Sequence, residues 1–195
     1  MPIKITFKDI EKEYFLKKLS SSYSYLEYGA GGSTILAFLE PSIKTIRSIE
    51  TTHKWIKIVN ENLNYIDKDV SVDYIDINSD ENNLGYPKNK SKIENWSLYQ
   101  QYCAGKNFDL CLIDGRFRVS SFIHAYINAP IGCTLLIHDY PINNKGRTYY
   151  KSIEKIANKK EQVGSFAMFY KSENLDDNLS LKAKQIINSH TNDPR

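Results

Sequence analysis

The sequence has little that would mark an exported, membrane-embedded or disulfide-stabilised protein. Its 195 residues contain three cysteines, an odd number without a close pair, which indicates neither a disulfide framework nor a zinc finger. No apolar run approaches the roughly 18 to 20 residues of a membrane-spanning helix. The N-terminus has no apolar segment followed by a small-residue cleavage site. We therefore expect a cytoplasmic protein without a membrane partner.

An excess of charge of one sign is also missing. The chain has 26 Lys and Arg against 23 Asp and Glu, a formal net charge of +3. This balance predicts no nucleic-acid partner, because such proteins carry a strongly basic surface. Only 5 of the 26 basic residues are arginine. The few arginines are therefore candidates for positions that need a planar, bidentate guanidinium, which lysine cannot replace.

Apolar segments that alternate with amphipathic segments predict an α/β fold. Strands are predicted at 23–28, 43–49, 70–77, 108–113, 133–137 and 163–170, and helices at 8–19, 35–39, 53–63, 93–103, 119–126 and 150–157. This alternation is typical of a three-layer, Rossmann-like domain with a mostly parallel sheet, here with one or two C-terminal antiparallel strands. We expect one domain over residues 1–171 and a polar C-terminal tail over 172–195 with a short helix at 181–187.

Each of the first five predicted strands ends in an acidic residue. These residues are Glu27, Glu50, Asp76, Asp114 and Asp139. Ligands bind beyond the carboxyl ends of the strands in open α/β sheets. We therefore expect the functional site at this edge of the sheet.

A glycine-rich turn follows the first predicted strand, with the sequence EYGAGGST at residues 27–34. Gly29 and Gly31 permit a tight turn and a close approach of a ligand to the backbone. Glu50 lies 21 residues beyond Gly29, the spacing of an acid that binds ribose hydroxyls. A dinucleotide fingerprint has Gly or Ala where this chain has Thr34, and Glu27 would repel a pyrophosphate but suit a cationic ligand. The turn therefore favours S-adenosylmethionine over NAD, and an NAD-linked oxidoreductase is the weaker alternative.

These motifs resemble those of the class I S-adenosylmethionine-dependent methyltransferases over about residues 20–170. The sequences LGYP at 84–87, DGRFR at 114–118 and LLIHDY at 135–140 are similar to a small bacterial group of methyltransferase-like proteins. The resemblance implies the class I methyltransferase fold. The C-terminus departs from the pattern, because it looks too short for the full strand hairpin of that fold.

The resemblance also implies which residues bind the cofactor: Glu27, Gly29, Ala30, Gly31, Ser33, Thr34, Glu50, Thr51, Trp55, Asp76, Ile77 and Asp114. Those of the glycine turn would hold the methionine part, and Glu50 would bind the ribose. Asp76 and Ile77 would flank the adenine. Asp114 would lie near the transferable methyl group.

The candidate catalytic residues are Asp114, Arg116, Arg118, His138 and Asp139. The two arginines either pair with the two aspartates or clamp an anionic group of the acceptor. His138 is either a general base, as Asp139 could also be, or a strand-end residue that bonds to its neighbours.

A metal site is a further candidate. Metal-dependent O-methyltransferases have an acid after the fourth strand and an Asp-Asn pair after the fifth. Asp114 and Asp139 match the two acids, but Tyr140 replaces the Asn. Two carboxylates and water could bind Mg²⁺, although the missing third ligand disfavours it.

Taken together, the sequence predicts an S-adenosylmethionine-dependent methyltransferase that methylates an oxygen of a small or carbohydrate-like polar acceptor, an anion if the arginines bind it. The alternative is a module of the same fold that binds S-adenosylmethionine or S-adenosylhomocysteine without catalysis.

Overall fold

The computed structural model describes residues 5–63, 68–143 and 145–195. Residues 1–4, part of the N-terminal segment considered above for an export signal, lie outside this description. The elements in chain order are α1 Asp9–Ser20, β1 Ser24–Tyr28, α2 Gly32–Leu39, β2 Thr45–Glu50, α3 His53–Asn62, β3 Asp69–Tyr74, β4 Ser79–Asp80, β5 Tyr86–Pro87, α4 Glu94–Gln100, β6 Leu110–Ile113, α5 Arg118–Asn128, β7 Thr134–Ile137, the 3₁₀ helix η1 Thr148–Lys155, β8 Lys159–Val163, β9 Phe166–Tyr170 and α6 Asp177–His190. Among these described helices, none has the length and apolarity needed to cross a membrane.

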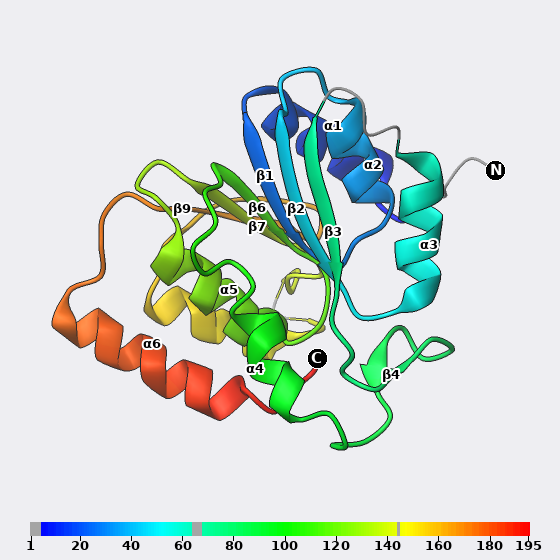
Figure 1. The fold of residues 1–195 in the computed structure, drawn as a ribbon. Coiled ribbons are helices and arrows are strands. Elements are labelled where there is room, and N and C mark those ends of the chain that lie inside the picture. Colours follow the sequence, from blue (N-terminus) through cyan, green and yellow to red (C-terminus); the bar gives the residue numbers. More distant parts are fainter. Residues whose placement is uncertain (1–4, 64–67, 144) are drawn as a thin grey trace.

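A seven-stranded sheet in the order β3-β2-β1-β6-β7-β9-β8 forms the centre of the molecule (Figure 1). The neighbouring strands β3, β2, β1, β6 and β7 pair in parallel. Strand β9 runs antiparallel to both β7 and β8. The predicted α/β fold with a mostly parallel sheet is therefore confirmed. The expectation of an incomplete C-terminal hairpin is wrong, because Val163 and Phe166 pair across a tight turn that joins two full strands, β8 and β9.

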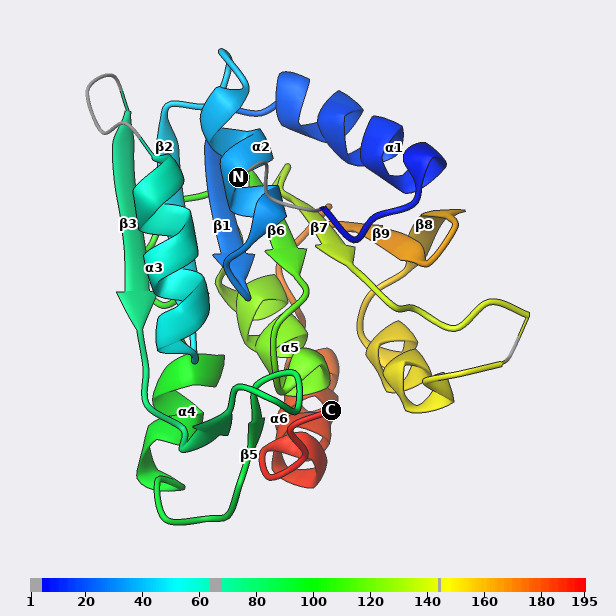
Figure 2. The ribbon, with the colours of Figure 1, turned by 90° about the vertical axis from the view of Figure 1, so that its right-hand side faces the viewer.

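Helices cover both faces of the sheet, as three-layer packing requires. In Figure 2, α1, α2 and α3 lie on one face, and α4, α5 and α6 lie on the other. All four residues of β6 are buried, which explains the continuous apolar sequence of this strand. The face beside α5 carries the larger apolar cluster, which includes Phe122, Leu135 and Phe169. Phe15, Leu110 and Phe166 belong to a second cluster beneath α1.

The C-terminal residues fold against the rest of the chain. The helix predicted at 181–187 is longer and spans Asp177–His190, and it begins where the Asp176 side chain accepts a hydrogen bond from the backbone N–H of Leu179 at 2.7 Å. Ala183 and Ile186 on α6 are buried in the cluster beside α5.

Two hydrogen bonds fasten the end of α6 to the helix α4. The buried Gln100 amide donates to the carbonyl of Thr191 at 2.8 Å, and the Thr191 hydroxyl donates to the amide oxygen at 3.2 Å. Further on, the carbonyls of Pro194 and Arg195 accept from the first backbone N–H groups at α5, those of Phe117 and Arg118. The last residues of the chain therefore lie beside the site described below.

The segment after β3 departs from the prediction. The predicted third strand, 70–77, ends at Tyr74, where the partner strand β2 also ends at Glu50. Ile77 instead turns into the core beside Trp96 and is fully buried. The chain then forms the antiparallel pair β4–β5, with Asp80 opposite Tyr86. This pair, called here the β4–β5 hairpin, comes from the long polar segment in which the sequence predicted only one helix.

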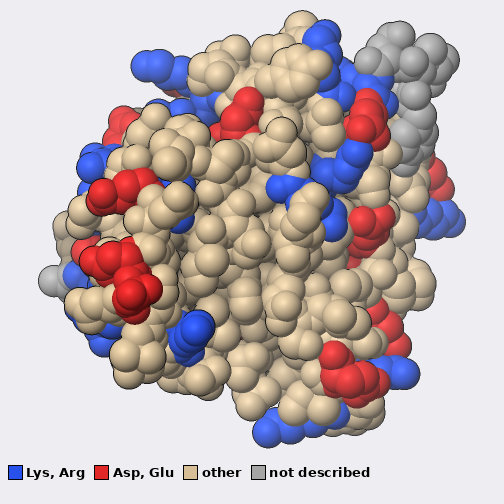
Figure 3. Space-filling view, turned by 60° about the vertical axis from the view of Figure 1, so that its left-hand side comes forward, with Lys and Arg blue, Asp and Glu red and all other residues tan. Residues whose placement is uncertain are grey.

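Charges of both signs are spread over the surface. On the face drawn in Figure 3, Lys and Arg side chains lie near Asp and Glu side chains, and the described residues form no continuous patch of one sign there. This distribution agrees with the near-balance of charge in the sequence.

Candidate functional site

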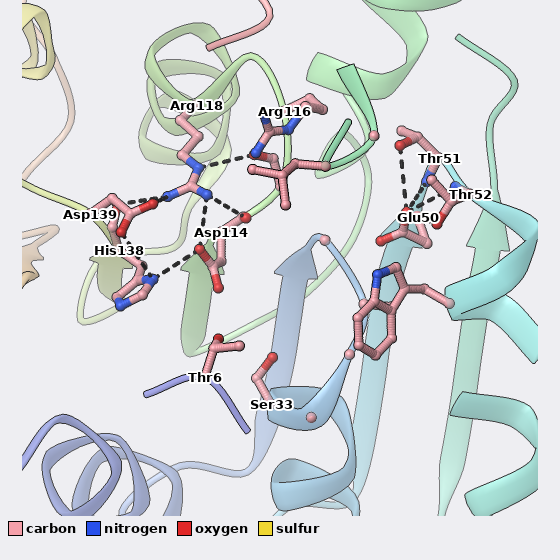
Figure 4. Close-up of a pocket in the computed structure, with 18 of the residues that line it drawn as sticks. Thr6, Ser33, Glu50, Thr51, Thr52, Asp114, Arg116, Arg118, His138 and Asp139 are labelled. Carbon is pink, nitrogen blue, oxygen red and sulfur yellow. Dashed lines mark hydrogen bonds and ion pairs between the residues drawn. The ribbon is translucent and has the colours of Figure 1, made fainter. Parts of the chain in front are cut away.

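A cavity of about 540 Å³ opens at the carboxyl ends of β1, β2, β6 and β7, the edge at which the sequence placed the site (Figure 4). The predicted residues that line it are Gly29, Ala30, Gly31, Ser33, Glu50, Thr51, Trp55, Asp114, Arg116, Arg118, His138 and Asp139. Four predicted residues do not line it: Glu27, Thr34, Asp76 and Ile77.

The glycine turn brings the ends of β1 and β6 into close contact. Gly29 has a φ of +93°, in the region that favours glycine, and a Cβ on it would lie 2.7 Å from Cα of Gly115. A Cβ on Gly115 would in turn overlap the hydroxyl of Tyr99. Gly31 differs, because the nearest atom to a Cβ there is in Trp55, 4.0 Å away. Gly29 and Gly115 are thus needed for the fold, whereas Gly31 leaves open space on the cavity side.

Glu27 lies beneath the glycine turn rather than in the cavity. Its carboxylate is fully buried and accepts hydrogen bonds from the hydroxyls of Ser33, Thr34 and Ser48, the last two at 2.5 and 2.9 Å. Burial raises the pKa of Glu27 to about 7, against the lowering effect of these hydrogen bonds. The residue holds the turn in place, and the sequence could not show that its side chain points inward.

Glu50 presents one free carboxylate oxygen to the cavity. Its Oε1 accepts from the backbone N–H groups of Thr51 and Thr52 at 2.7 and 2.8 Å and from the hydroxyls of Thr52 and Thr51 at 2.9 and 3.5 Å. Oε2 has no hydrogen-bond donor among the described residues, and Figure 4 shows it directed toward the middle of the cavity. Burial raises the pKa of Glu50 despite the hydrogen bonds from Thr51 and Thr52. The side chain is thus rigid, with one acceptor left for a ligand.

Arg118 ties together the loops after β6 and β7. Its Nε and Nη2 donate to the carbonyls of Gly115 and Asp114 at 3.0 and 2.8 Å, and its Nη1 donates to the carbonyl of His138 at 2.9 Å. The remaining N–H groups form ion pairs of 3.0 Å with Asp114 Oδ1 and Asp139 Oδ2. All five donors of this buried guanidinium are therefore used within the protein. Of the two predicted roles, pairing with the aspartates is the one this geometry favours for Arg118.

Both loops that Arg118 ties have strained backbone. Phe117 and Asp139 have φ values of 51° and 58°, in the left-handed region that non-glycine residues rarely adopt. Such conformations persist where the surrounding structure fixes them, and they cluster at functional sites. The bonds from Arg118 supply that constraint here.

His138 faces carboxylates on two sides. Its Nδ1 lies 3.1 Å from Asp114 Oδ1, and its buried Nε2 lies 3.8 Å from Glu11 Oε2, too far for a hydrogen bond. Burial lowers the pKa of His138, but the bond to Asp114 and the negative charges of Asp114 and Asp139 together outweigh it, so the net pKa is raised. The ring also packs against Phe7 and Phe166. This geometry favours a bonding role over that of a general base, which needs a neutral nitrogen facing the acceptor.

Asp114 keeps one oxygen free while its charge is stabilised. Burial alone would raise the pKa of Asp114, but Arg118 and His138 hold it below its ordinary value. Figure 4 shows the oxygen that is not bonded to Arg118 directed toward Thr6. Asp114 is therefore a fixed negative charge at this end of the cavity.

The candidate metal ligands do not fit a divalent cation well. Asp114, His138 and Asp139 each offer a donor atom, all within 4.8 Å of one another. Arg118 bonds both carboxylates, however, and Arg147 lies 3.3 Å from Asp139. Two guanidinium groups at the donor atoms would repel Mg²⁺. Tyr140, at the position of the missing third ligand, is buried and donates to Glu154.

Part of the lining comes from residues that were not among the predicted site residues. These lining residues are Ile5, Thr6, Phe7, Gly32, Thr52, Lys54, Glu81, Leu84, Gly85, Tyr99, Gly115 and Arg147. Ile5 to Phe7 precede α1 without any motif, and Tyr99 has the helical spacing of a core residue. The LGYP sequence was the one signal for the β4–β5 hairpin, which brings Leu84 and Gly85 to the cavity.

Comparisons with known proteins support this fold. No family model matches the chain, and no curated protein sequence matches it. A methyltransferase-like protein from Silicibacter pomeroyi has a similar crystal structure, with a TM-score of 0.78, 22% identity and 98% of both chains covered. The N-methyltransferase NodS from Bradyrhizobium japonicum, crystallised with S-adenosylhomocysteine, is also similar. Its TM-score is 0.54 at 14% identity, with 86% of this chain and 90% of that chain covered.

The chain has the class I methyltransferase fold. Its sheet order, with the antiparallel strand β9 between β7 and β8, agrees with this. In this methyltransferase fold the cavity lies where the sequence placed a ligand, between the glycine turn, Glu50 and Asp114.

Proposed function

We propose that the protein is an S-adenosylmethionine-dependent methyltransferase. The observation that carries the proposal is Glu50, whose Oε1 is held by four donors while Oε2 faces the cavity next to the glycine turn. A fixed carboxylate oxygen at the end of the second strand suits the hydroxyls of a ribose. The similarity to NodS, which was crystallised with S-adenosylhomocysteine, supports the same ligand class.

The proposed cofactor extends from Glu50 to Asp114. The ribose binds Glu50, the methionine part follows the open backbone at Gly31, and the sulfonium lies toward the negative charge of Asp114. Glu27 and Thr34 support the turn from below. Asp76 and Ile77 do not line the cavity. We therefore propose that they support the adenine site without touching the adenine.

Methyl transfer is an in-line displacement in which the methyl carbon leaves sulfur for the acceptor atom. The protein therefore accelerates it mainly by holding the two reactants in line and excluding water. In the proposed O-methylation, the hydroxyl proton of the acceptor passes to Asp139 or to water. Asp139 is the more accessible of the two candidate bases, because its side chain is 40% exposed, whereas both nitrogens of His138 face carboxylates.

The proposed acceptor is a small or carbohydrate-like polar molecule. Asp139 and Arg147 line both the main cavity and an adjoining hollow of about 530 Å³. Asn143 and Lys145 are further polar residues in the lining of this hollow. Because a polar wall must be matched by hydrogen-bonding groups of the ligand, a polar acceptor fits it better than an apolar one.

Calorimetric titration with S-adenosylhomocysteine tests the proposed function. We expect micromolar binding by the wild-type protein and a loss of about tenfold or more in Glu50→Gln, which removes the anionic acceptor for the ribose. Glu81→Gln is the matched control, because Glu81 is also an acid in the cavity wall but is exposed and, among the described residues, accepts a hydrogen bond only from the Lys54 backbone at 3.2 Å. Absence of binding to the wild-type protein, or equal affinity in Glu50→Gln, would contradict the proposal.

A further inference from the structure

Arg116 is a buried residue of the cavity wall whose side chain lacks a counterion. It is 6% exposed, and its Nη1 has no hydrogen-bond partner among the described residues. Its main chain is fixed, because the backbone N–H donates to the Tyr99 hydroxyl at 3.0 Å. A buried charged donor without an acceptor destabilises a protein, so its presence needs an explanation.

The other four arginines of the chain all have carboxylate partners. Arg118 and Arg147 pair with Asp139 at 3.0 and 3.3 Å. Away from the cavity, Arg47 pairs with Asp69, and Arg195 pairs with Asp193. Within the part of the chain that the structure describes, Arg116 is therefore the arginine whose charge is left for a ligand.

The guanidinium of Arg116 is held in a way that leaves its edge available. Its plane lies over the ring of Tyr86 in the β4–β5 hairpin, 4.2 Å from the ring centroid. Stacking of this kind uses the face of the guanidinium and not its N–H groups. Those in-plane donors match the two oxygens of a carboxylate or phosphate group.

Arg116 lies across the cavity from the glycine turn, along which the methionine part of the cofactor is proposed to lie. Figure 4 shows it between Glu50 and the Arg118 cluster, with Ser33 of the glycine turn across the cavity. Its charge opposes the rise that burial causes in the pKa of Glu50, but no ion pair joins the two side chains. With the ribose on Glu50 and the methionine part on the glycine turn, we take the counterion for Arg116 to come from a second ligand.

We propose that the methyl acceptor is an anion whose carboxylate or phosphate group binds the edge of the Arg116 guanidinium, an inference that rests on the proposed methyltransferase function. Arg116 is then a specificity-determining residue. Arg118, which the sequence suggested as part of the same clamp, acts only on the protein's own loops. The sequence could not distinguish the two arginines, because both belong to the same DGRFR motif.

The test uses the full chain saturated with S-adenosylhomocysteine, titrated in a calorimeter with inorganic phosphate and, separately, with succinate. We expect the wild-type protein to bind at least one probe below about 10 mM. Arg116→Gln should weaken that binding about tenfold or more. Arg116→Lys keeps the charge but loses the planar pair of N–H donors, so its affinity for the probe should lie between those of Arg116→Gln and the wild-type protein. Lys182→Gln, which removes an exposed cation from α6 outside the cavity lining, should bind the probe like the wild-type protein.

Two further readouts separate this role from others. If Arg116 binds the acceptor, Arg116→Gln keeps its affinity for S-adenosylhomocysteine within about twofold and melts within about 2 °C of the unliganded wild-type protein or above it. A marked loss of cofactor affinity would assign Arg116 to the cofactor and overturn the inference. So would a failure of the loaded wild-type protein to bind either probe, or equal probe binding in Arg116→Gln. Failure of the methyltransferase proposal itself appears earlier, as no binding of S-adenosylhomocysteine.

Discussion

At the scale of single residues, Glu27 shows how a binding motif depends on a buried charge. Its carboxylate holds Ser33 and Thr34 at the start of α2, and Ser48 holds it from β2. Burial outweighs these three hydrogen bonds, so the folded protein keeps the Glu27 proton more tightly than the unfolded chain does. The glycine turn should therefore be most stable when Glu27 is protonated.

This difference predicts a pH-dependent stability. The pKa of Glu27 rises from 4.5 to about 7 on folding, so its contribution is fully present below pH 4.5 and is lost as the pH rises through about 7. The loss amounts to about 3 kcal/mol. Urea unfolding at a series of pH values should show this fall in the wild-type protein and a flatter curve in Glu27→Gln.

An exposed acid on α1 provides the control for that measurement. Glu13→Gln should keep the wild-type curve. The raised pKa of His138 also removes stability as the pH rises above its ordinary value of 6.5, but both variants retain this contribution. If Glu27→Gln and the wild-type protein have parallel curves between pH 4.5 and 7, the buried charge does not control the turn.

At the scale of elements, the site depends on how closely β1 and β6 approach at their carboxyl ends. Gly29 and Gly115 meet there without side chains, and the Tyr99 hydroxyl fills the space beside Gly115. Gly31 lies in the same turn with an extended φ of −178°, a conformation that any residue adopts. Gly29 and Gly115 are therefore needed for the fold, whereas Gly31 leaves space for the ligand.

A pair of alanine substitutions tests this separation. Gly115→Ala should destabilise the protein by about 3 kcal/mol or more, because its Cβ has no room beside Tyr99 and Gly29. Gly31→Ala should change the unfolding free energy by about 0.5 kcal/mol or less, yet weaken S-adenosylhomocysteine binding about tenfold, since its Cβ enters the space proposed for the methionine part. Chemical unfolding and calorimetry measure the two effects. Unchanged cofactor affinity in Gly31→Ala would contradict the proposed position of the methionine part along this turn.

The sequence predicted the elements well where local pattern and topology agree. Parallel strands with helical crossovers follow from alternating segments, and the fully buried β6 has the expected continuous apolar sequence. The errors lie where tertiary contacts decide the outcome. Ile77 continues the apolar alternation of β3 but enters the core, and α6 is polar in sequence because only residues such as Ala183 and Ile186 are buried.

At the scale of the whole molecule, the cavity is assembled from segments far apart in the chain. Phe7 comes from the N-terminal segment, Leu84 from the β4–β5 hairpin and Arg147 from the loop before η1. The residues that follow strands could be placed from the sequence because parallel strands end at one edge of the sheet. Phe7 and Arg147 could not be assigned a role in this way, since only the folded chain brings them to that edge.

The same assembly decides which predicted residues act together. Asp114, Arg118, His138 and Asp139 form one bonded cluster, and Glu50 lies apart from it with its own threonine donors. The spacing of the motifs indicated proximity, but it could not show that Arg118 is saturated while Arg116 is not. The two arginines differ in how their hydrogen bonds are distributed in the folded protein, and the sequence does not record this.

A crystal structure of the protein with S-adenosylhomocysteine tests the central claim most directly. We predict density in the main cavity, with the ribose hydroxyls within hydrogen-bonding distance of Glu50, the methionine part along the glycine turn and the sulfur atom toward Asp114. The ligand would then span the cavity from Glu50 to Asp114. Binding at another place, or in this cavity with the ribose away from Glu50, would contradict the account.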